Sequence, residues 1–453
     1  MVRVSYWRLL AIVVFGMLAV ATGVVRGQTA SAPAEDDAVL QALVAEALAR
    51  NPDLHAAQSA IAAAQTRTVA AQARPDPMVS MTYTNDGWAP SLGSMPMTTL
   101  GFMVSQEFPY SGKRQLRADL ATSQARQIEP QLTRARLAIE AAVKRAYYGL
   151  TLARELQSLT AEQRELWTQI EVVARSRYAV GQGAQQDVLR VQVEVTRIEQ
   201  RAIEQAAEAE LRLAEINRLL ARPLETPIAT PTQLTLRLLS GTAQDAFELA
   251  RANSPELAGG RLAIDTERAA LAVARREFKP DFTIQGGYMN RGGLDAMWLA
   301  GVGMTLPFNK KARESAVANA EIRARGGAHA VESMSLQLQY RTNERFTRAK
   351  TAEKIVALYD GGIVLQDQMT VEAAVANYQS GKVPFVSVLE AMTALYADRW
   401  TRAGLVADHA RLLASLHEAS LDSTPDMTTA AGPVASGAST GQAGPMSGGM
   451  GGR

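Results

Sequence analysis

The sequence predicts a mainly α-helical fold that carries β-hairpins and contains two copies of one helix–hairpin–helix unit. Sustained heptad patterns of apolar residues predict helices much longer than those of an ordinary globular domain. Two separate regions of apolar–polar alternation predict strands. Short motifs that recur about 200 residues apart indicate an internal duplication.

The composition limits the class of protein. The chain has 453 residues, of which 47% are apolar and only 6% aromatic, and it contains no cysteine. The lack of cysteine excludes a disulfide scaffold, a thiolate metal site, a cysteine nucleophile and the cysteine-linked lipid anchor of bacterial lipoproteins. A net charge of +2 provides no basic field for nucleic acid, and four histidines leave little material for a histidine metal site.

The N-terminus has the pattern of an export signal. Arg3 and Arg8 flank the start of an apolar run over residues 9–25, and small residues follow this run. We therefore expect a signal peptide over residues 1–27 and a linker over residues 28–37. The alternative is a membrane anchor, but a spanning helix needs about 20 apolar residues. No later segment contains 18 consecutive apolar residues.

The rest of the chain repeats itself. Tyr178 and Gly181 recur as Tyr378 and Gly381, and a valine–leucine pair follows each motif. The stretch Asn51-Pro52-Asp53-Leu54 also has a counterpart at residues 253–257. The predicted boundaries are 38–221 for the first repeat, 222–242 for an equatorial linker, 243–420 for the second repeat and 421–453 for a disordered Gly-, Ser- and Met-rich tail.

Each repeat is expected to contain a helix, two strands, a long helix, a tight turn and a returning helix. The first repeat gives a helix over 38–73, a β-hairpin over about 78–108, a long helix over 111–178 with a kink at Pro130, and a helix over 185–221. The second gives a helix over 243–277, a hairpin over about 281–307, a long helix over 309–378 and a helix over 385–420.

Helix lengths suggest how these elements stack. At 1.5 Å per residue each long helix extends about 100 Å, whereas residues 185–221 and 243–277 extend about 55 and 52 Å. We therefore expect these two shorter helices to stack end to end beside a long helix. By the same argument, the helix over 385–420 is expected to stack on the N-terminal helix over 38–73. Both hairpins would then lie at one end.

The hairpins suit a membrane barrel. Four amphipathic strands of about 8–12 residues match the 9–11 residues that a transmembrane strand needs. Open sheet edges are not tolerated in lipid, so such a barrel has to close through other subunits. The alternative is the edge of a soluble sandwich. The export signal and the lack of a later apolar span favour an outer membrane.

Three sequence features resemble the TolC family of outer membrane efflux proteins: the Asn51-Pro52-Asp53-Leu54 stretch, residues 106–114 and the two Tyr-x-x-Gly turns. The resemblance covers both repeats. It implies a homotrimer with a 12-stranded β-barrel and a periplasmic α-helical barrel, and it implies no cofactor. Its partners would be a periplasmic adaptor and an inner-membrane pump, and its function the passive exit of substrate through an outer membrane channel.

The resemblance also implies two functional regions. The tight turns would be periplasmic tips that contact the adaptor, through Val180, Gly181, Gln182 and Gly183 in the first and Ser380, Gly381, Lys382 and Val383 in the second. The family closes its pore with polar side chains just above the tips, and the matching positions are Asp187, Tyr378 and Glu390. Three copies of the two acids would form rings that favour cations.

The sequence departs from the family pattern at this gate. In better-known members a basic residue at the second tip locks the gate, but Val383 stands there, and Ser387 replaces an acid. The same salt-bridged lock is therefore not expected. For Asp187 a second interpretation stays open, because an acid near a helix N-terminus also stabilises the helix dipole. The two roles are compatible.

The cargo is indicated less directly. Residues 106–114 are most similar to the branch that serves heavy-metal RND pumps, and five methionines cluster around the first hairpin: Met78, Met81, Met95, Met97 and Met103. Thioethers suit Cu(I) or Ag(I). Alternatively, these methionines face lipid or pack against neighbours. Met446 and Met450 in the tail are further possible ligands. Drug efflux and type I protein secretion are the other cargo hypotheses.

Two other classes of protein are less well supported. A periplasmic coiled-coil adaptor or scaffold would not need duplicated amphipathic hairpins. An enzyme is not indicated, since His417-Glu418 lacks the partner histidine of a zinc protease motif and no phosphate loop or nucleophile elbow occurs. We therefore assign no catalytic, cofactor-binding or metal-ligating residue from the sequence.

Overall fold

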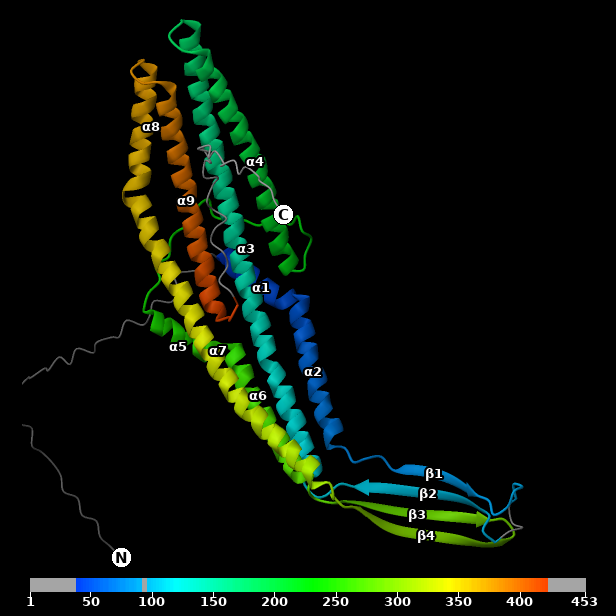
Figure 1. Cartoon of the computed structure of the whole chain (residues 1–453). Coiled ribbons are helices and arrows are strands. Elements are labelled where there is room, and N and C mark those ends of the chain that lie inside the picture. Colours follow the sequence, from blue (N-terminus) through cyan, green and yellow to red (C-terminus); the bar gives the residue numbers. More distant parts are fainter. Residues whose placement is uncertain (1–37, 92–95, 423–453) are drawn as a thin grey trace, which may run out of the picture.

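The computed structural model describes residues 38–91 and 96–422, which form a long bundle of helices with a sheet at one end (Figure 1). The fold is mainly α-helical with a small β part, as the sequence predicts. The expected signal peptide and linker lie outside the described residues. So do Met95, Met446 and Met450, together with the tail beyond Asp422.

The elements follow the same order in both halves of the chain. The first half contains α1 (Ala38–Arg50), α2 (Pro52–Gln72), β1 (Met78–Thr84), β2 (Thr99–Phe108), α3 (Lys113–Ala179) and α4 (Gln185–Leu219). The second half contains α5 (Ala243–Asn253), α6 (Pro255–Arg276), β3 (Asp281–Arg291), β4 (Leu294–Thr305), α7 (Lys310–Leu358), the π-helical turn η1 (Tyr359–Ile363), α8 (Val364–Gln379) and α9 (Phe385–Glu418).

The first helix of each half is broken, whereas the sequence analysis predicted one helix. Asn51 is extended (φ −64°, ψ 123°), and its side chain accepts a hydrogen bond from the Asp53 N–H, so that it caps α2. Ser254 caps α6 in the same way through the Leu257 N–H. A proline follows each cap at the first helical position, where its missing N–H does no harm. These motifs therefore end one helix and begin the next.

The two long helices also differ from each other. α3 continues as one helix of 67 residues through Pro130. The predicted helix over residues 309–378 is instead interrupted by the π-helical turn Tyr359–Ile363, which contains Gly361 and Gly362. Such a turn inserts one extra residue and shifts the side chains that follow it around the helix. A heptad pattern alone does not locate this insertion.

The predicted stacking of the shorter helices is wrong. The C-terminal end of α4 meets α1 and α2 of its own repeat, where Nδ2 of buried Asn51 donates to the Leu219 carbonyl over 2.9 Å (Figure 1). The C-terminal end of α9 meets α5, and Ala419 lies in one buried cluster with Phe247 and Ala250. The candidate helices have nearly equal lengths, so length could not distinguish stacking within a repeat from stacking between repeats. The buried contacts show that each returning helix stacks within its own repeat.

The two hairpins form one four-stranded antiparallel sheet in the order β1-β2-β3-β4. β2 and β3 join the hairpins, with Phe102 opposite Tyr288 and Phe108 opposite Phe282. The sheet projects from the end of the helical bundle (Figure 1). None of the described helices is long and apolar enough to cross a membrane.

Candidate functional site

The helical tips are two copies of one turn, at the end of the molecule opposite the sheet (Figure 1). Residues 180–184 join α3 to α4, and residues 380–384 join α8 to α9. Each turn contains a glycine with a positive φ angle, 73° at Gly181 and 77° at Gly381. Glycine adopts this conformation without the steric cost that other residues incur. The shared glycine of the two motifs therefore sets the turn.

Backbone hydrogen bonds close both turns identically. The Gln182 N–H donates to the Arg177 carbonyl over 2.9 Å, and the Lys382 N–H donates to the Asn377 carbonyl over 2.9 Å. Bonds of this span satisfy carbonyls that the end of a helix would otherwise leave unpaired. Each helix therefore ends in a turn that its own backbone hydrogen bonds close.

Arg177 joins the two tips within one protomer. Its guanidinium lies over the ring of Tyr378, 4.6 Å from the ring centre. It donates one hydrogen bond to the Tyr378 carbonyl and a second, of 3.0 Å, to the Gln182 carbonyl. One side chain on α3 therefore holds the end of α8 and its own turn together.

Tyr378 connects the same helices to α4. Its hydroxyl donates to Oδ2 of Asp187 over 3.4 Å, and the residue is only 3% exposed. Its ring contacts Phe385 edge-on, and Phe385 contacts Trp167 in the same way. Burial and the nearby Asp187 carboxylate raise the pKa of the Tyr378 hydroxyl. The phenol therefore remains a hydrogen-bond donor throughout the neutral range.

The structure brings two of the three expected gate residues together. Asp187 and Tyr378 are hydrogen-bonded, whereas Glu390 is exposed on α9 and has no hydrogen bond or ion pair with the part of the chain that the structure describes. Asp187 lies in the first turn of α4, whose N-cap, Ala184, makes no side-chain cap bond. Its carboxylate bonds Tyr378 from a position that also suits the helix dipole.

The adaptor-contacting residues proposed from the sequence are largely accessible. The exposed ones are Val180, Gly181, Gln182, Ser380, Gly381 and Lys382. Gly183 and Val383 are half-buried. Val383 packs against the apolar cluster around Tyr378 and Phe385, which explains why an apolar residue is favourable there.

Sequence reasoning missed Arg177. The motif Arg177-Tyr178 aligns with Asn377-Tyr378, so the arginine is a difference between the two copies. The structure treats the two tyrosines differently, since Tyr178 is 49% exposed and Tyr378 is 3% exposed. The sequence offers one signal for the role of Arg177: the aligned position in the second repeat is an asparagine, Asn377. Nothing in the sequence indicates which of the two tyrosines is buried.

At the other end of the molecule, the two faces of the sheet differ in chemistry. Paired residues share a face, and alternate residues along a strand lie on the same face. The mainly apolar face contains Val79, Met81, Tyr83, Leu100, Phe102, Val104, Phe108, Phe282, Ile284, Tyr288, Trp298, Val302 and Met304, with Gln106 and Asn290 as its polar members. The polar face contains serine, threonine, glycine, glutamine, glutamate and Asp281 together with Leu299 and four methionines.

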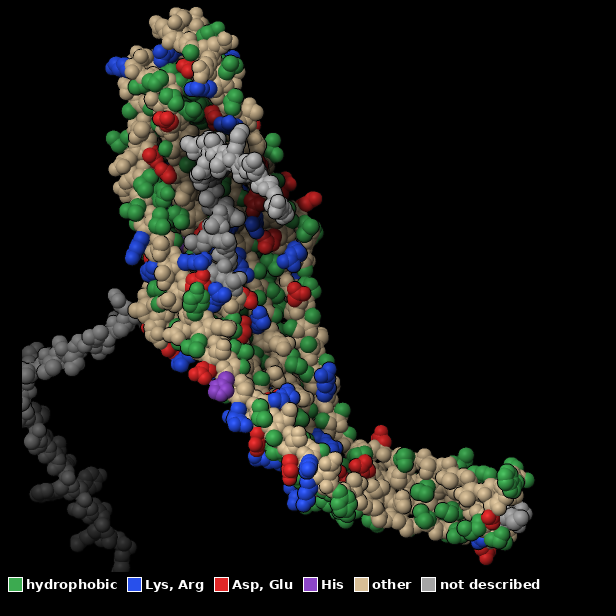
Figure 2. All heavy atoms as spheres, in the orientation of Figure 1, with side chains coloured by type: hydrophobic (Ala, Val, Ile, Leu, Met, Phe, Trp, Pro, Cys, Tyr) green, Lys and Arg blue, Asp and Glu red, His purple; other side chains and the backbone are tan. Residues whose placement is uncertain are grey.

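The apolar face is suited to lipid. Val302 is 77% exposed and Trp298 81% exposed, which in water would be unfavourable for so large a connected surface. Figure 2 shows charged side chains along the helices and at both ends of the sheet, but few between those ends on the face in view. An uncharged band between charged ends is typical of a sheet that crosses a bilayer.

The helices also expose apolar residues in the single protomer. On α4 these are Leu189, Val193, Ile203 and Leu211, and on α7 and α8 they are Ile322, Leu336, Tyr340, Leu358, Leu365 and Met369. The two sets lie on different helical hairpins. Surfaces of this kind are expected where one subunit packs against the next in a closed ring.

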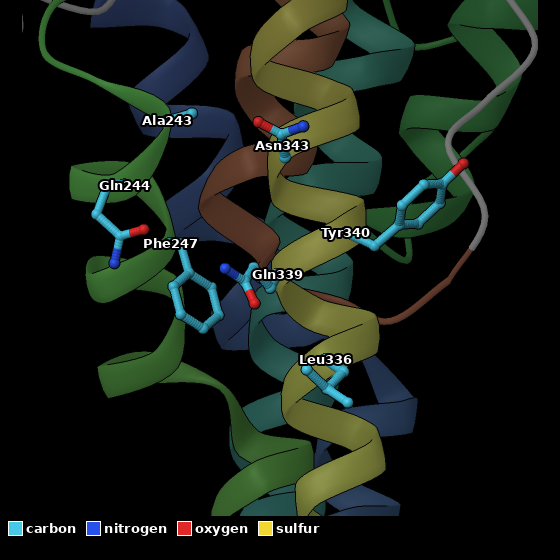
Figure 3. A pocket seen from close by; sticks show the side chains of 7 residues that line it. All are labelled: Ala243, Gln244, Phe247, Leu336, Gln339, Tyr340 and Asn343. Carbon is cyan, nitrogen blue, oxygen red and sulfur yellow. The ribbon is translucent and has the colours of Figure 1, made fainter.

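A shallow groove lies between α5 and α7. It has a volume of about 320 Å³ and is lined by Ala243, Gln244, Phe247, Leu336, Gln339, Tyr340 and Asn343. Phe247 faces α7 across the groove, whereas the ring of Tyr340 points away from α5 (Figure 3). The lining includes no carboxylate, histidine or lysine. Its exposed residues continue the α7 surface described above.

A match to a family model shows which family the chain belongs to. The model of the outer membrane efflux protein family matches residues 43–222 and 246–420, which is most of the chain. The chain belongs to the outer membrane efflux protein family. It is therefore a TolC-like outer membrane channel with a periplasmic helical barrel, and not an enzyme. The four strands of this protomer are a third of the 12 strands in the trimeric barrel of this family.

Solved structures have the same fold at low sequence identity. CusC aligns with a TM-score of 0.72 and 18% identity, over 84% of this chain and 92% of that chain. VceC from Vibrio cholerae aligns with a TM-score of 0.68 and 19% identity, over 84% of this chain and 95% of that chain. The open state of MtrE from Neisseria gonorrhoeae gives 0.69 and 19%, over 84% of this chain and 88% of that chain.

Among curated proteins, the alkaline protease secretion protein AprF of Pseudomonas aeruginosa is 29% identical over 141 residues. The alignment covers 30% of this chain and 29% of AprF. The chain thus matches less than a third of the length of this relative. The likeness is consistent with the family but extends over only part of either protein.

Proposed function

We propose that the chain is the outer-membrane component of a tripartite efflux system, into which an inner-membrane RND-type pump and a periplasmic adaptor deliver substrate. The observation that carries the proposal is the arrangement of the protomer, with an amphipathic sheet at one end and two paired, exposed helical tips at the other. Export would depend on a signal peptide within residues 1–27, without lipidation. The adaptor would contact the eight tip residues named above.

The gate is the contact between the tips. Asp187 and Tyr378 hold α4 to α8, and Arg177 holds α3 to α8, so the two hairpins of a protomer stay together in this state. Glu390 has no hydrogen-bond or ion-pair partner among the described residues. In a trimer, three copies of Glu390 would form an acidic ring near the level of Asp187. Opening would require the hairpin of α8 and α9 to separate from that of α3 and α4.

For the cargo we propose heavy-metal cations, with soft monovalent ions preferred. The support is chemical, because acidic side chains near the tips attract cations and thioethers on the sheet suit Cu(I) and Ag(I). Among the described residues there is no group of three or more histidine, aspartate and glutamate side chains placed to hold a metal ion.

Type I secretion of a protein is the second candidate. It is favoured by one observation, the 29% identity with the alkaline protease secretion protein AprF. A secretion channel would need no thioethers and would have to open widely enough for an unfolded chain. Drug efflux is a third cargo and has no specific support from the described residues.

Deletion of the gene tests the cargo. We expect the deletion strain to become more sensitive to copper and silver salts, with unchanged drug sensitivity and unchanged amounts of secreted protein. Complementation with the intact gene should restore resistance. Unchanged metal sensitivity together with loss of a secreted protein would instead establish the secretion role.

A further inference from the structure

The polar face of the sheet carries methionines that have no packing role in a lipid-facing surface. Met81 and Met304 lie on the apolar face, where thioethers pack like other apolar groups. Met78, Met103, Met289 and Met297 lie on the opposite face, one on each strand. In a membrane barrel this face lines the lumen. Contact with lipid therefore does not account for these four methionines.

The strand register brings three of them together. Met289 on β3 is directly opposite Met297 on β4. Met103 on β2 is opposite Gly287, two residues before Met289, so Met103 and Met289 are diagonal neighbours. Opposed side chains have Cβ atoms about 5 Å apart, and diagonal neighbours are within reach of long side chains. Met78 on β1 is a diagonal neighbour of Met103, so the row of methionines crosses all four strands.

The central side chains each pass beside a glycine of the neighbouring strand. A Cβ atom at Gly287 would lie 3.6 Å from Cγ of Met103, and a Cβ atom at Gly101 would lie 3.5 Å from Cγ of Met289. Each methionine therefore leans over the glycine that faces it on the neighbouring strand. The two side chains thus extend toward each other's strand at neighbouring register positions on one face of the sheet.

We infer that Met103, Met289 and Met297 form a thioether site for a soft monovalent cation, Cu(I) or Ag(I), on the lumen face of the barrel. Soft d¹⁰ cations favour thioether ligands, and the surrounding hydroxyl and amide groups do not compete for them. The strand register places the three residues side by side, and their flexible side chains can turn the sulfurs toward one cation. The inference rests on the proposed function, because the face is a lumen only in the assembled channel.

Such a site would assist transit rather than storage. Conduction requires a site that an ion enters readily and leaves readily, and several weak sites in a row meet this requirement better than one strong site. Met297 is 49% exposed and Met78 is 63% exposed, so the row is open to the lumen at both ends. The trimer would carry three such rows.

Silver titration of the purified trimer tests the site. The probe is Ag⁺ in nitrate buffer, because chloride precipitates silver, and binding is measured by isothermal titration calorimetry. The test variant carries Met103→Leu, Met289→Leu and Met297→Leu, which keep side-chain volume nearly constant. We expect it to lose one Ag⁺ site per protomer, or at least tenfold in affinity.

The matched control removes the same number of thioethers elsewhere, through Met81→Leu, Met304→Leu and Met369→Leu. We expect it to titrate like the unaltered trimer. The inference is overturned if the test variant binds as many Ag⁺ ions as the unaltered protein, or if the control loses as much. Metal resistance of the deletion strain reports on the cargo separately. Silver binding without a resistance phenotype contradicts the cargo alone, and resistance without silver binding contradicts the site alone.

Discussion

At the scale of single residues, the tip contact depends on one arginine. Arg177 combines a cation–π contact with two hydrogen bonds to carbonyls, and such charged bonds contribute about 1.5–3 kcal/mol each. Arg177→Ala should therefore destabilise the tips by about 2–4 kcal/mol and lower the apparent melting temperature of the detergent-solubilised trimer by several degrees.

Arg175 supplies the control for this prediction. It lies half a turn away on α3, is exposed, and forms an i,i+4 ion pair with Glu171 over 2.7 Å. Exposed pairs of this kind contribute about 0.3–0.5 kcal/mol. Arg175→Ala should therefore leave the melting temperature nearly unchanged. Equal effects of the two substitutions would contradict the specific role of Arg177.

A second residue-scale prediction concerns pH. Burial and the neighbouring Asp367 carboxyl raise the pKa of Asp398 to about 6. The folded state therefore binds this proton more tightly than the unfolded state, and the free energy of unfolding falls as pH rises from about 4 to about 6. Asp398→Asn should remove that loss and stabilise the protein at pH 7.5 by about 1 kcal/mol, allowing for solvent screening.

The measurement is the difference in apparent melting temperature between variant and unaltered protein, taken from pH 4 to 8 at a fixed scan rate. The difference should be small at pH 4, grow through pH 6 and then stay constant. Asp360→Asn is the control, because Asp360 is paired with Arg402 and should gain no stability. A difference that does not change with pH would refute the assignment.

At the scale of elements, the junction between α4 and α2 depends on Asn51. This buried side chain caps α2 through the Asp53 N–H and also donates to the Leu219 carbonyl over 2.9 Å. Asn51→Ala would remove the cap and leave a buried carbonyl unpaired, at a cost of about 2–4 kcal/mol. Ser254→Ala removes a cap and should cost only about 1 kcal/mol.

Urea denaturation of the purified protein, followed by circular dichroism, would measure both effects. The larger effect of Asn51→Ala follows from the stacking of α4 on α2 within one repeat. Equal destabilisation of the two variants would mean that the hydrogen bond from Asn51 to the Leu219 carbonyl adds nothing to the free energy of unfolding. That result would contradict a stabilising role of this bond in the stacking of α4 on α2.

The same elements show what the sequence could predict. The strands and the tips follow from local rules, because alternation marks Val79 and Phe102 and a positive φ angle requires Gly181. The break at Asn51 is also local information, because an asparagine followed by proline can cap a helix as well as mark a repeat. The π-helical turn at Tyr359 and the choice of stacking partner depend on packing between distant segments. Sequence spacing does not record that packing.

The candidate site was predictable only in part. The family resemblance located Asp187 and Tyr378, which the structure joins by a hydrogen bond. Arg177 was missed, because its role requires knowing that Tyr378 rather than Tyr178 is buried. The sequence shows a cluster of methionines around the first hairpin. Only the strand register shows that Met81 and Met103 lie on opposite faces of the sheet. It also shows that Met289 and Met297 of the second hairpin lie on the same face as Met103.

At the scale of the whole molecule, the protomer is an incomplete object. Its sheet has open edges at β1 and β4, and its helices expose apolar surfaces on α4 and on α7 and α8. Three copies around one axis would pair the open sheet edges and cover the exposed apolar surfaces of the helices. The chain is therefore held in the membrane by a barrel to which each protomer contributes a third.

The central claim is that this barrel is a channel closed where the helical tips meet, and single-channel recording in planar bilayers tests it most directly. The variant combines Asp187→Ala with Glu390→Ala and is compared with the unaltered trimer. We predict small, cation-preferring current steps for the unaltered protein, and steps several-fold larger with weaker cation preference for the variant. Equal conductance and equal selectivity in the two proteins would contradict the account.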